Sequence, residues 1–317
     1  MKLLGQLTRW FLTAALLALA LRQAPPEQWL PSLQRVHWAW MALAAALMAG
    51  IVALNTWKWQ LLLEVQGIRP GYPRLLYHYG VGYFFNSFIT GSGDLKRAAD
   101  LGREQKATAQ ATASVLVERW TGVMGQLALA STTLLAAFLA DPASLWPLTL
   151  FSAGLCGVLI LGYLWFEDAH PAAPRPPGDL LSRPLAWVHR LRLALAAYRG
   201  TRRVWWGALA LSLGGPLLLV AIHACLARAL GLHPPLVALL LFIPTVSVFA
   251  QLPITINGFG LQDWFMVALL QGALDPGQAM ALSMVFHALR LGVGASGGLL
   301  FALTPELGLA GAPAAGR

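Results

Sequence analysis

The sequence predicts an all-α integral membrane protein that crosses the bilayer several times, with two further apolar stretches that enter it without crossing. Hydrophobic residues make up 57% of the 317-residue chain and charged residues 11%, whereas a soluble domain carries about 25% charged residues. Several apolar runs approach or exceed the ~20 residues that a helix needs to span a bilayer. Composition therefore excludes a large soluble domain, and we expect residues 1–317 to form a single transmembrane domain.

Five apolar runs are good candidates for spanning helices, and a sixth, residues 3–21, is weaker because Arg9 interrupts it. The five are residues 36–54, 120–140, 145–166, 204–227 and 278–303. The N-terminal run is either a retained helix, which we favour, or a signal peptide whose cleavage site is Ala18-Leu19-Ala20. We therefore expect about six spanning helices.

Two other apolar regions do not fit ordinary spanning helices. Residues 75–91 form a short run that contains three glycines, and residues 236–274 form a longer one that is interrupted by Pro244, Pro253 and the sequence NGFG at 257–260. The arms of the longer run, 236–250 and 264–274, are each too short to span. Irregular backbone at membrane depth is tolerated only where protein or a water-filled cavity satisfies it. We therefore expect two re-entrant or broken hairpins.

The positions of Lys and Arg predict the orientation, because cytoplasmic loops of membrane proteins are enriched in them. With both hairpins returning to the side they enter from, the cytoplasmic segments are 1–9, 55–119, the Pro/Arg-rich loop 167–203 and the tail. All Lys and Arg lie in these segments except Arg22, Arg35, Arg228 and the helical Arg290. We therefore expect an inner-membrane protein with both termini in the cytoplasm. A single crossing by residues 236–274 would reverse the last helix, and charge hardly opposes it.

The same distribution explains the formal charge of +9. The excess comes from loop arginines beside membrane helices, which set orientation. No basic patch with interleaved aromatic residues and no zinc-ligand spacing is present, so we expect no nucleic-acid partner and no metal.

The two broken regions share a short pattern. The sequences FITGSGDLKR (88–97) and PITINGFGLQD (253–263) each contain Ile-Thr, then Gly-x-Gly, a leucine and an acidic residue. One hairpin would enter from the cytoplasm and the other from outside, as in the inverted repeats of many transporters. Chance similarity between two membrane loops is the alternative. The glycines that would permit tight turns or close backbone approach are Gly91, Gly93, Gly258 and Gly260.

Arg290 is the most informative single residue, because an ionised side chain inside a membrane helix costs roughly 2.5–3.5 kcal/mol on insertion scales and usually faces a partner. One interpretation is that Arg290 faces a central cavity and binds a lipid phosphate, with Asp263 as its partner when the cavity is empty. The other is a permanent Arg290–Asp263 ion pair that only fixes packing. His287 shares the helix face of Arg290, and Asn257 either satisfies the turn backbone or hydrogen-bonds a headgroup.

A second group of charges follows the first broken region. Asp94 and Arg97 are three residues apart, at the predicted start of a helix that Ser92 caps. This helix start either favours an anion or is an ordinary capped end at the cytoplasmic surface. Glu118 and Arg119 precede the next predicted span, so we expect them at the membrane surface. A buried pair between Glu118 and Arg97 is the alternative.

These segments resemble a known family. The sequences NSFITGSGDLKRAADLG (86–102) and ATASVLVERWTG (111–122) are similar to the first signature of the lysylphosphatidylglycerol synthase transmembrane region. Its second signature resembles LPITINGFGLQDWFMVALL (252–270) followed by SMVFHALRLGVGASGGLL (283–300). The similarity extends from about residue 5 to residue 304.

The chain departs from the family pattern at both turns. Ile89-Thr90 stand where the first turn usually has a proline before its glycines, and Gln262-Asp263 stand where the second usually has Arg-Glu. The missing cation at position 262 removes any headgroup contact that depends on it.

The resemblance implies a lipid-related function. In bifunctional members this region resembles a flippase for aminoacylated phospholipid, and a separate soluble domain, which we do not find before Arg317, makes the lipid. We therefore expect a translocase of flippase or scramblase type for a phospholipid or lipid-linked headgroup, with a separate synthase or glycosyltransferase as a partner. The candidate substrate-binding residues are Asp94, Arg97, Glu118, Arg119, Asn257, Asp263, His287 and Arg290.

Two alternatives belong to other classes: a membrane-embedded headgroup or glycosyl transferase, and an accessory subunit of a lipid or polysaccharide synthase. The sequence contains no nucleotide-binding loop, metal-ligand set or nucleophile–base pair that indicates catalysis. We therefore expect no cofactor, and an enzyme is the less favoured interpretation.

Overall fold

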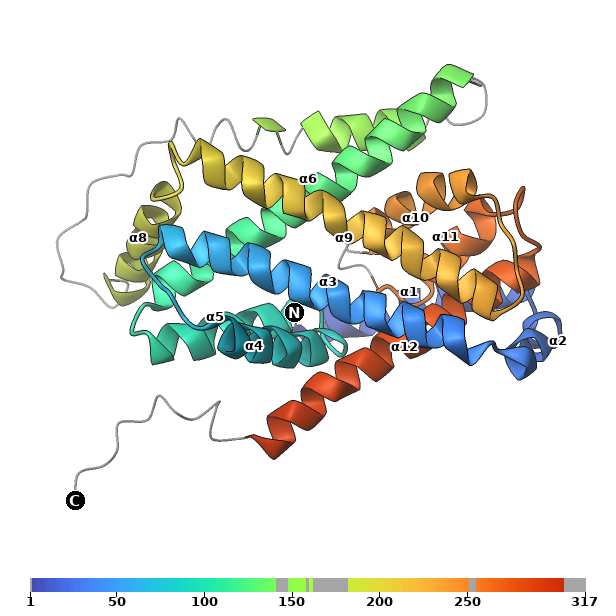
Figure 1. The fold of residues 1–317 in the computed structure, drawn as a ribbon, viewed down its shortest axis with the longest axis horizontal. Helices are drawn as coiled ribbons and strands as arrows, with labels where there is room; N and C mark the ends of the chain where they lie inside the picture. Colours follow the sequence, from blue (N-terminus) through green and yellow to red (C-terminus); the bar gives the residue numbers. More distant parts are fainter. Residues whose placement is uncertain (1, 141–147, 158–159, 162–181, 251–254, 305–317) are drawn as a thin grey trace.

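The computed structural model describes residues 2–140, 148–157, 160–161, 182–250 and 255–304, in which the regular elements are helices (Figure 1). Four of the described helices are long and apolar enough to cross a membrane. They are α3 (Trp38–Val65), α6 (Thr108–Ala140), α9 (Arg202–Ala229) and α12 (Pro276–Leu303). The all-helical membrane fold is therefore confirmed, and these four helices correspond to four of the predicted spans.

Two predicted spans were too short at one end. The run 36–54 continues as α3 to Val65, and the run 120–140 begins as α6 at Thr108. Both predictions ended the helix where charged residues appear. The structure continues it because Lys58 and Glu118 are buried against each other, with 1% and 4% of their surfaces exposed.

The remaining predicted spans have different outcomes. Run 3–21 forms the helix α1 (Lys2–Gln23), which packs against the second hairpin. Run 145–166 falls partly outside the described residues, and the part that is described contains the short apolar helix Leu148–Gly157. Of the predicted loop 167–203, only the part from residue 182 is described, and it forms α8 (Ser182–Ala196), which packs against α6.

Two helical hairpins occupy the places of the two broken regions. The first consists of α4 (Tyr72–Asn86) and α5 (Ser92–Glu104), and the second of α10 (Leu236–Ala250) and α11 (Leu261–Leu269), with the helices of each pair packed together. The first follows α3 and the second follows α9, which run in opposite directions along the molecule, so the hairpins enter from opposite ends (Figure 1). Pro253 lies outside the described residues.

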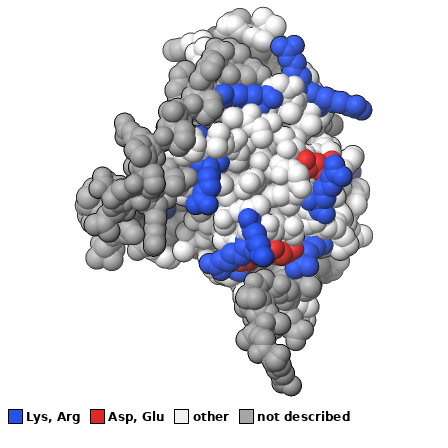
Figure 2. Space-filling model, turned by 90° about the vertical axis from the view of Figure 1, so that its left-hand side faces the viewer, with Lys and Arg blue, Asp and Glu red and all other residues white. Residues whose placement is uncertain are grey.

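The remaining described elements are short and connect the long helices. The helix α2 (Pro26–Trp29) and the 3-10 helix η1 (Leu30–Arg35) join α1 to α3, and both pack against α12. The end of the molecule where α3 ends and α9 begins carries several Lys and Arg side chains (Figure 2).

The tips of the two hairpins meet beside the middle of α12. The side-chain amide of Asn257 donates to the carbonyl oxygen of Ser87 at 2.9 Å, and Arg290 donates to the carbonyl oxygen of Asn257 at 2.7 Å. The second turn also contacts α1, where the backbone N–H of Ile256 donates to the hydroxyl of Thr13 at 3.0 Å. Each turn therefore obtains hydrogen-bond partners from the rest of the protein.

A glycine with positive φ stands directly before the second helix of each hairpin. Gly91 has φ 85° and Gly260 has φ 77°, a backbone region that residues with a Cβ rarely adopt. Gly258 also has positive φ. Gly93 instead permits close approach, because a Cβ at this position would overlap the carbonyl oxygen of Gly82 in α4.

The predicted cap of α5 was wrong. The Ser92 hydroxyl donates backward to the carbonyl oxygens of Phe85 and Ile89, each at 2.8 Å. The side-chain oxygen of Asn86 accepts from the N–H of Gly93 at 2.9 Å. Ser92 therefore bonds to the end of α4 and the turn that follows it. The start of α5, which Ser92 was expected to cap, is instead bonded by the side chain of Asn86 from α4.

Close contact between α12 and α4 leads to the first testable prediction. A Cβ at Gly297 would overlap the carbonyl oxygen of Gly80, whereas a Cβ at Gly292, on the same helix, would meet no atom within 4 Å. We expect Gly297→Ala to lower the thermal unfolding temperature of the purified protein, because overpacking costs about 1–3 kcal/mol. Gly292→Ala should leave that temperature unchanged or raise it, because alanine favours a helix by about 1 kcal/mol over glycine. Equal unfolding temperatures for both variants would contradict this packing.

Candidate functional site

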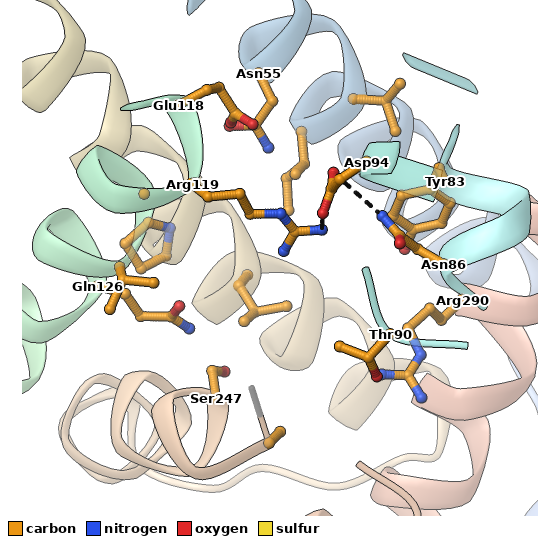
Figure 3. Close-up of a pocket in the computed structure, with 18 of the residues that line it drawn as sticks. Asn55, Tyr83, Asn86, Thr90, Asp94, Glu118, Arg119, Gln126, Ser247 and Arg290 are labelled. Atoms are coloured by element: carbon orange, nitrogen blue, oxygen red, sulfur yellow. Dashed lines mark hydrogen bonds and ion pairs between the residues drawn. The ribbon is translucent and has the colours of Figure 1, made fainter. Parts of the chain in front are cut away.

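A cavity of about 700 Å³ lies where the hairpin tips approach the spanning helices. Its wall takes residues from both hairpins and from α3, α6, α9 and α12. Figure 3 shows polar side chains around it, with Arg119 extending from α6 toward Asp94 and Arg290 pointing from α12 toward Thr90. The charged residues of the wall are Lys58, Asp94, Arg97, Glu118, Arg119 and Arg290. With four cations and two carboxylates, the charged wall has an excess of positive charge.

Five of these charges form one connected cluster. Glu118 receives Lys58 Nζ at 3.0 Å on one carboxylate oxygen and Arg97 Nη2 at 2.5 Å on the other. Asp94 receives Arg97 Nη2 at 3.0 Å and Arg119 Nη2 at 2.5 Å. The pairing of Asp94 with Arg97 follows their spacing of three residues, and the buried Glu118–Arg97 pair is the alternative that the sequence left open.

The expected surface position of Glu118 was wrong, and its surroundings give the physical reason. Glu118 is 4% exposed and Arg97 is 2% exposed, and burying an isolated charge costs far more than burying a matched pair. The Arg97 guanidinium lies 4.8 Å from the ring centre of Trp59 and 4.5 Å from that of Tyr79. Aromatic faces attract a guanidinium, so the rings complete its buried environment.

The second acidic residue, Asp263, is bound differently from the prediction. Asp263 does not form an ion pair with Arg290: its Oδ1 receives the Ser283 hydroxyl at 2.5 Å and His287 Nε2 at 2.9 Å. Its Oδ2 receives the N–H of Gly260 at 2.8 Å. With its carboxylate oxygens bound by these three donors, Asp263 fixes the start of α11 against α12. His287 therefore separates the two residues that were expected to touch.

Arg290 contacts neutral groups. Its Nη2 donates to the carbonyl oxygen of Asn257 at 2.7 Å and to Nδ1 of His287 at 3.0 Å. The guanidinium lies 5.7 Å from the ring centre of Phe259 and 5.8 Å from that of Phe286. Its Nε is buried and has no hydrogen-bond partner among the described residues. Arg290 thus lines the cavity as a cation whose Nε–H is available for a further hydrogen bond.

The structure brings six of the eight predicted site residues to the cavity wall. These are Asp94, Arg97, Glu118, Arg119, Asn257 and Arg290. Asp263 and His287 are not among the lining residues. They contact each other, and His287 in turn contacts Arg290. Of the four predicted turn glycines, Gly91 lines the cavity.

Sequence reasoning missed Lys58, which was assigned to a cytoplasmic segment. Its ammonium lies in the cavity wall and donates to the Ser212 hydroxyl of α9 at 3.2 Å. A signal was present in the sequence: Lys58 stands between Trp57 and Trp59, and the apolar run resumes directly after Gln60. A single lysine inside a continuing apolar run indicates a buried, paired charge better than it indicates a helix end.

The contacts of Ser283 and His287 differ from those of a serine nucleophile and its base. Ser283 and His287 both bond to Asp263, so the hydroxyl and the ring are held by the same carboxylate, unlike a serine activated by histidine. No group of three or more His, Cys, Asp or Glu side chains that could hold a metal ion occurs in the part of the chain that the structure describes.

Fold and site together define a helical membrane protein in which two opposed hairpins enclose a charged cavity. The model of the family described as lysylphosphatidylglycerol synthase TM region matches residues 6–297, which is nearly the whole chain. The chain therefore belongs to this family. No curated protein matches it with significance.

The charge cluster generates the second prediction. We expect Glu118→Gln to destabilise the protein by about 3–5 kcal/mol, because it leaves Lys58 and Arg97 buried without this carboxylate. Glu64→Gln, which changes an exposed residue of α3, should have little effect. The measurement is unfolding of the purified variants in detergent.

A second substitution separates charge pairing from simple packing. In the Glu118→Gln background, Lys58→Met removes one uncompensated cation and should recover part of the lost stability. If the two substitutions instead lower the free energy of unfolding additively, the Lys58–Glu118 ion pair does not contribute to stability.

Proposed function

We propose that this protein is a lipid translocase of flippase or scramblase type. In this proposal a phospholipid or lipid-linked headgroup that carries a negative charge passes through the cavity, while its acyl chains stay in the bilayer. The observation that carries the proposal is the positively charged cavity at the meeting point of two hairpins that enter from opposite ends. Family membership supports a membrane function related to lipid.

The preference for an anion rests on how the charges are paired. Asp94 and Glu118 are already engaged by Lys58, Arg97 and Arg119. Arg290 has two neutral acceptors and an Nε without a described partner. A guanidinium binds phosphate oxygens with charge-assisted hydrogen bonds, which are roughly twice as strong as neutral ones. A phosphate at Arg290 would supply the negative charge that its surroundings lack.

The two hairpins give the proposal its mechanism. Transporters built from opposed broken helices bind substrate between them and expose it to each side in turn by moving one half against the other. Here the contacts between Asn257 and Ser87 and between Arg290 and Asn257 join the hairpins and α12. A headgroup that replaces the Asn257 carbonyl at Arg290 would release the contact between the second hairpin and α12, so that this hairpin could move relative to α12.

Location and partners form part of the same proposal. The end of the molecule that carries several Lys and Arg side chains (Figure 2) would face the cytoplasm, because basic residues favour that side. This arrangement fits an inner-membrane protein, with a separate synthase or glycosyltransferase supplying its lipid. No contact among the described residues favours a transferase or an accessory subunit over translocation.

The experiment is lipid translocation by purified protein in liposomes. Fluorescent phosphatidylglycerol is placed in both leaflets, and a membrane-impermeant reductant measures how fast the inner-leaflet label becomes accessible. We expect Arg290→Ala to slow transfer on the order of 10- to 100-fold, because a hydrogen bond to a charged group contributes about 1.5–3 kcal/mol.

Arg228→Ala is the matched control, since this arginine is exposed and is not part of the cavity wall. It should transfer lipid at the wild-type rate. Equal transfer by wild type, Arg290→Ala and protein-free liposomes would exclude translocation under these conditions and overturn the proposal.

A further inference from the structure

His287 occupies an unusual position between the fixed carboxylate and the cavity arginine. The ring is 2% exposed, with Nε2 at 2.9 Å from Asp263 Oδ1 and Nδ1 at 3.0 Å from Arg290 Nη2. Phe259, from the turn of the second hairpin, stacks on the ring with 4.0 Å between ring centres. The imidazole therefore connects the cavity cation to a carboxylate that lies behind the wall.

The chemistry of the two neighbours determines which ring nitrogen carries hydrogen. A guanidinium has only donors, so His287 Nδ1 accepts from Arg290 and carries no proton. The hydrogen of the neutral ring is then on Nε2, where it is donated to Asp263. As long as Arg290 holds this contact, a second proton has no place on the ring.

We propose that His287 is a proton-binding site that is controlled by occupancy of Arg290. When an anionic phosphate draws the guanidinium away from His287, the Nδ1 lone pair becomes free. A proton from cavity water then forms an Nδ1–H bond, and the resulting imidazolium is balanced by Asp263. The anion and one proton are thus bound together. This inference rests on the proposed function for the identity of the anion and adds a coupling ion to it.

The charges around the ring support this order of events. Asp263 on α11 faces Nε2 and favours a positive ring, whereas Arg290, which lies on α12 with His287, faces Nδ1 and opposes it. The other titratable groups are His223 on α9, whose charge would oppose that of His287, and Tyr83 on α4, which interacts with Arg290. An anion at Arg290 therefore frees the acceptor and screens the nearest opposing charge in the same step.

The experiment measures proton uptake when the anion binds. Purified protein is titrated calorimetrically with short-chain phosphatidylglycerol in two buffers of different ionisation enthalpy, and the difference in heat gives the protons taken up. We expect the wild type to take up as much as about one proton per bound lipid, and its affinity to rise by up to about tenfold for each unit by which pH falls.

His287→Gln is the informative variant. Glutamine retains one N–H donor for Asp263 and one carbonyl acceptor for Arg290, but it does not titrate in this range. The variant should therefore bind the lipid without proton uptake and without the pH dependence. His223→Gln removes the neighbouring buried histidine and should keep both. Thermal unfolding of each variant verifies that it is folded.

A parallel titration with inorganic phosphate distinguishes the source of the anion. Uptake with the lipid alone assigns the site to a lipid headgroup, and equal uptake with both assigns it to any accessible phosphate; either result supports a proton site at His287. Lipid binding and transfer without proton uptake in the wild type would overturn this inference alone, as would equal uptake in His287→Gln. No binding of either ligand and no transfer would overturn the proposed function and this inference with it.

Discussion

Backbone that breaks inside a membrane must find its hydrogen-bond partners within the protein, because hydrocarbon offers none. This constraint explains why the two hairpins of this chain meet. The turn of the second hairpin gives the Asn257 amide to Ser87 of the first, and its own carbonyl receives Arg290 of α12. Neither turn could remain at this depth alone. One of the charges that line the cavity, Arg290, serves the same requirement by donating to the turn backbone.

The charges of the cavity divide into a closed group and an open one. The closed group is the connected cluster of five charges, in which Lys58, Arg97 and Glu118 are almost completely buried and Asp94 pairs with Arg97 and Arg119. This pairing suits a role in holding α3, α5 and α6 together. Among the described residues, the acceptors of Arg290 are neutral, and His287 lies between Arg290 and the carboxylate of Asp263. Arg97 also has one buried nitrogen, Nη1, without a partner among the described residues, but two carboxylates already contact its guanidinium. Arg290 is the open group and has no carboxylate partner among the described residues, so it has the most to gain from an incoming anion. Its link to the ring of His287 is what would allow binding to respond to pH.

The sequence predicts the elements of this fold better than it predicts their partners. The lengths of the apolar arms and the positions of glycine and proline indicate both hairpins. An apolar arm that is too short to span the bilayer is typical of a re-entrant segment. The cost of a charge in the membrane likewise predicts that Arg290 faces inward. The predicted Arg290–Asp263 pair was wrong because the choice of partner depends on helix packing. The packing places Ser283, His287 and the Gly260 N–H within hydrogen-bond distance of Asp263. Lys58 was missed because its partner Glu118 is distant in sequence.

The central claim, that both hairpin tips border one water-accessible cavity inside the membrane, is tested most directly by cysteine accessibility. Thr90→Cys of the first tip and Ser247→Cys of α10 both line the cavity, and Leu299→Cys on α12 is 60% exposed on an apolar surface. In intact membranes, with the native Cys156 and Cys225 replaced by serine, a small water-soluble thiol reagent should modify the first two and leave the third unmodified. If Thr90→Cys and Ser247→Cys are as unreactive as Leu299→Cys, the cavity is closed to water and the account is contradicted.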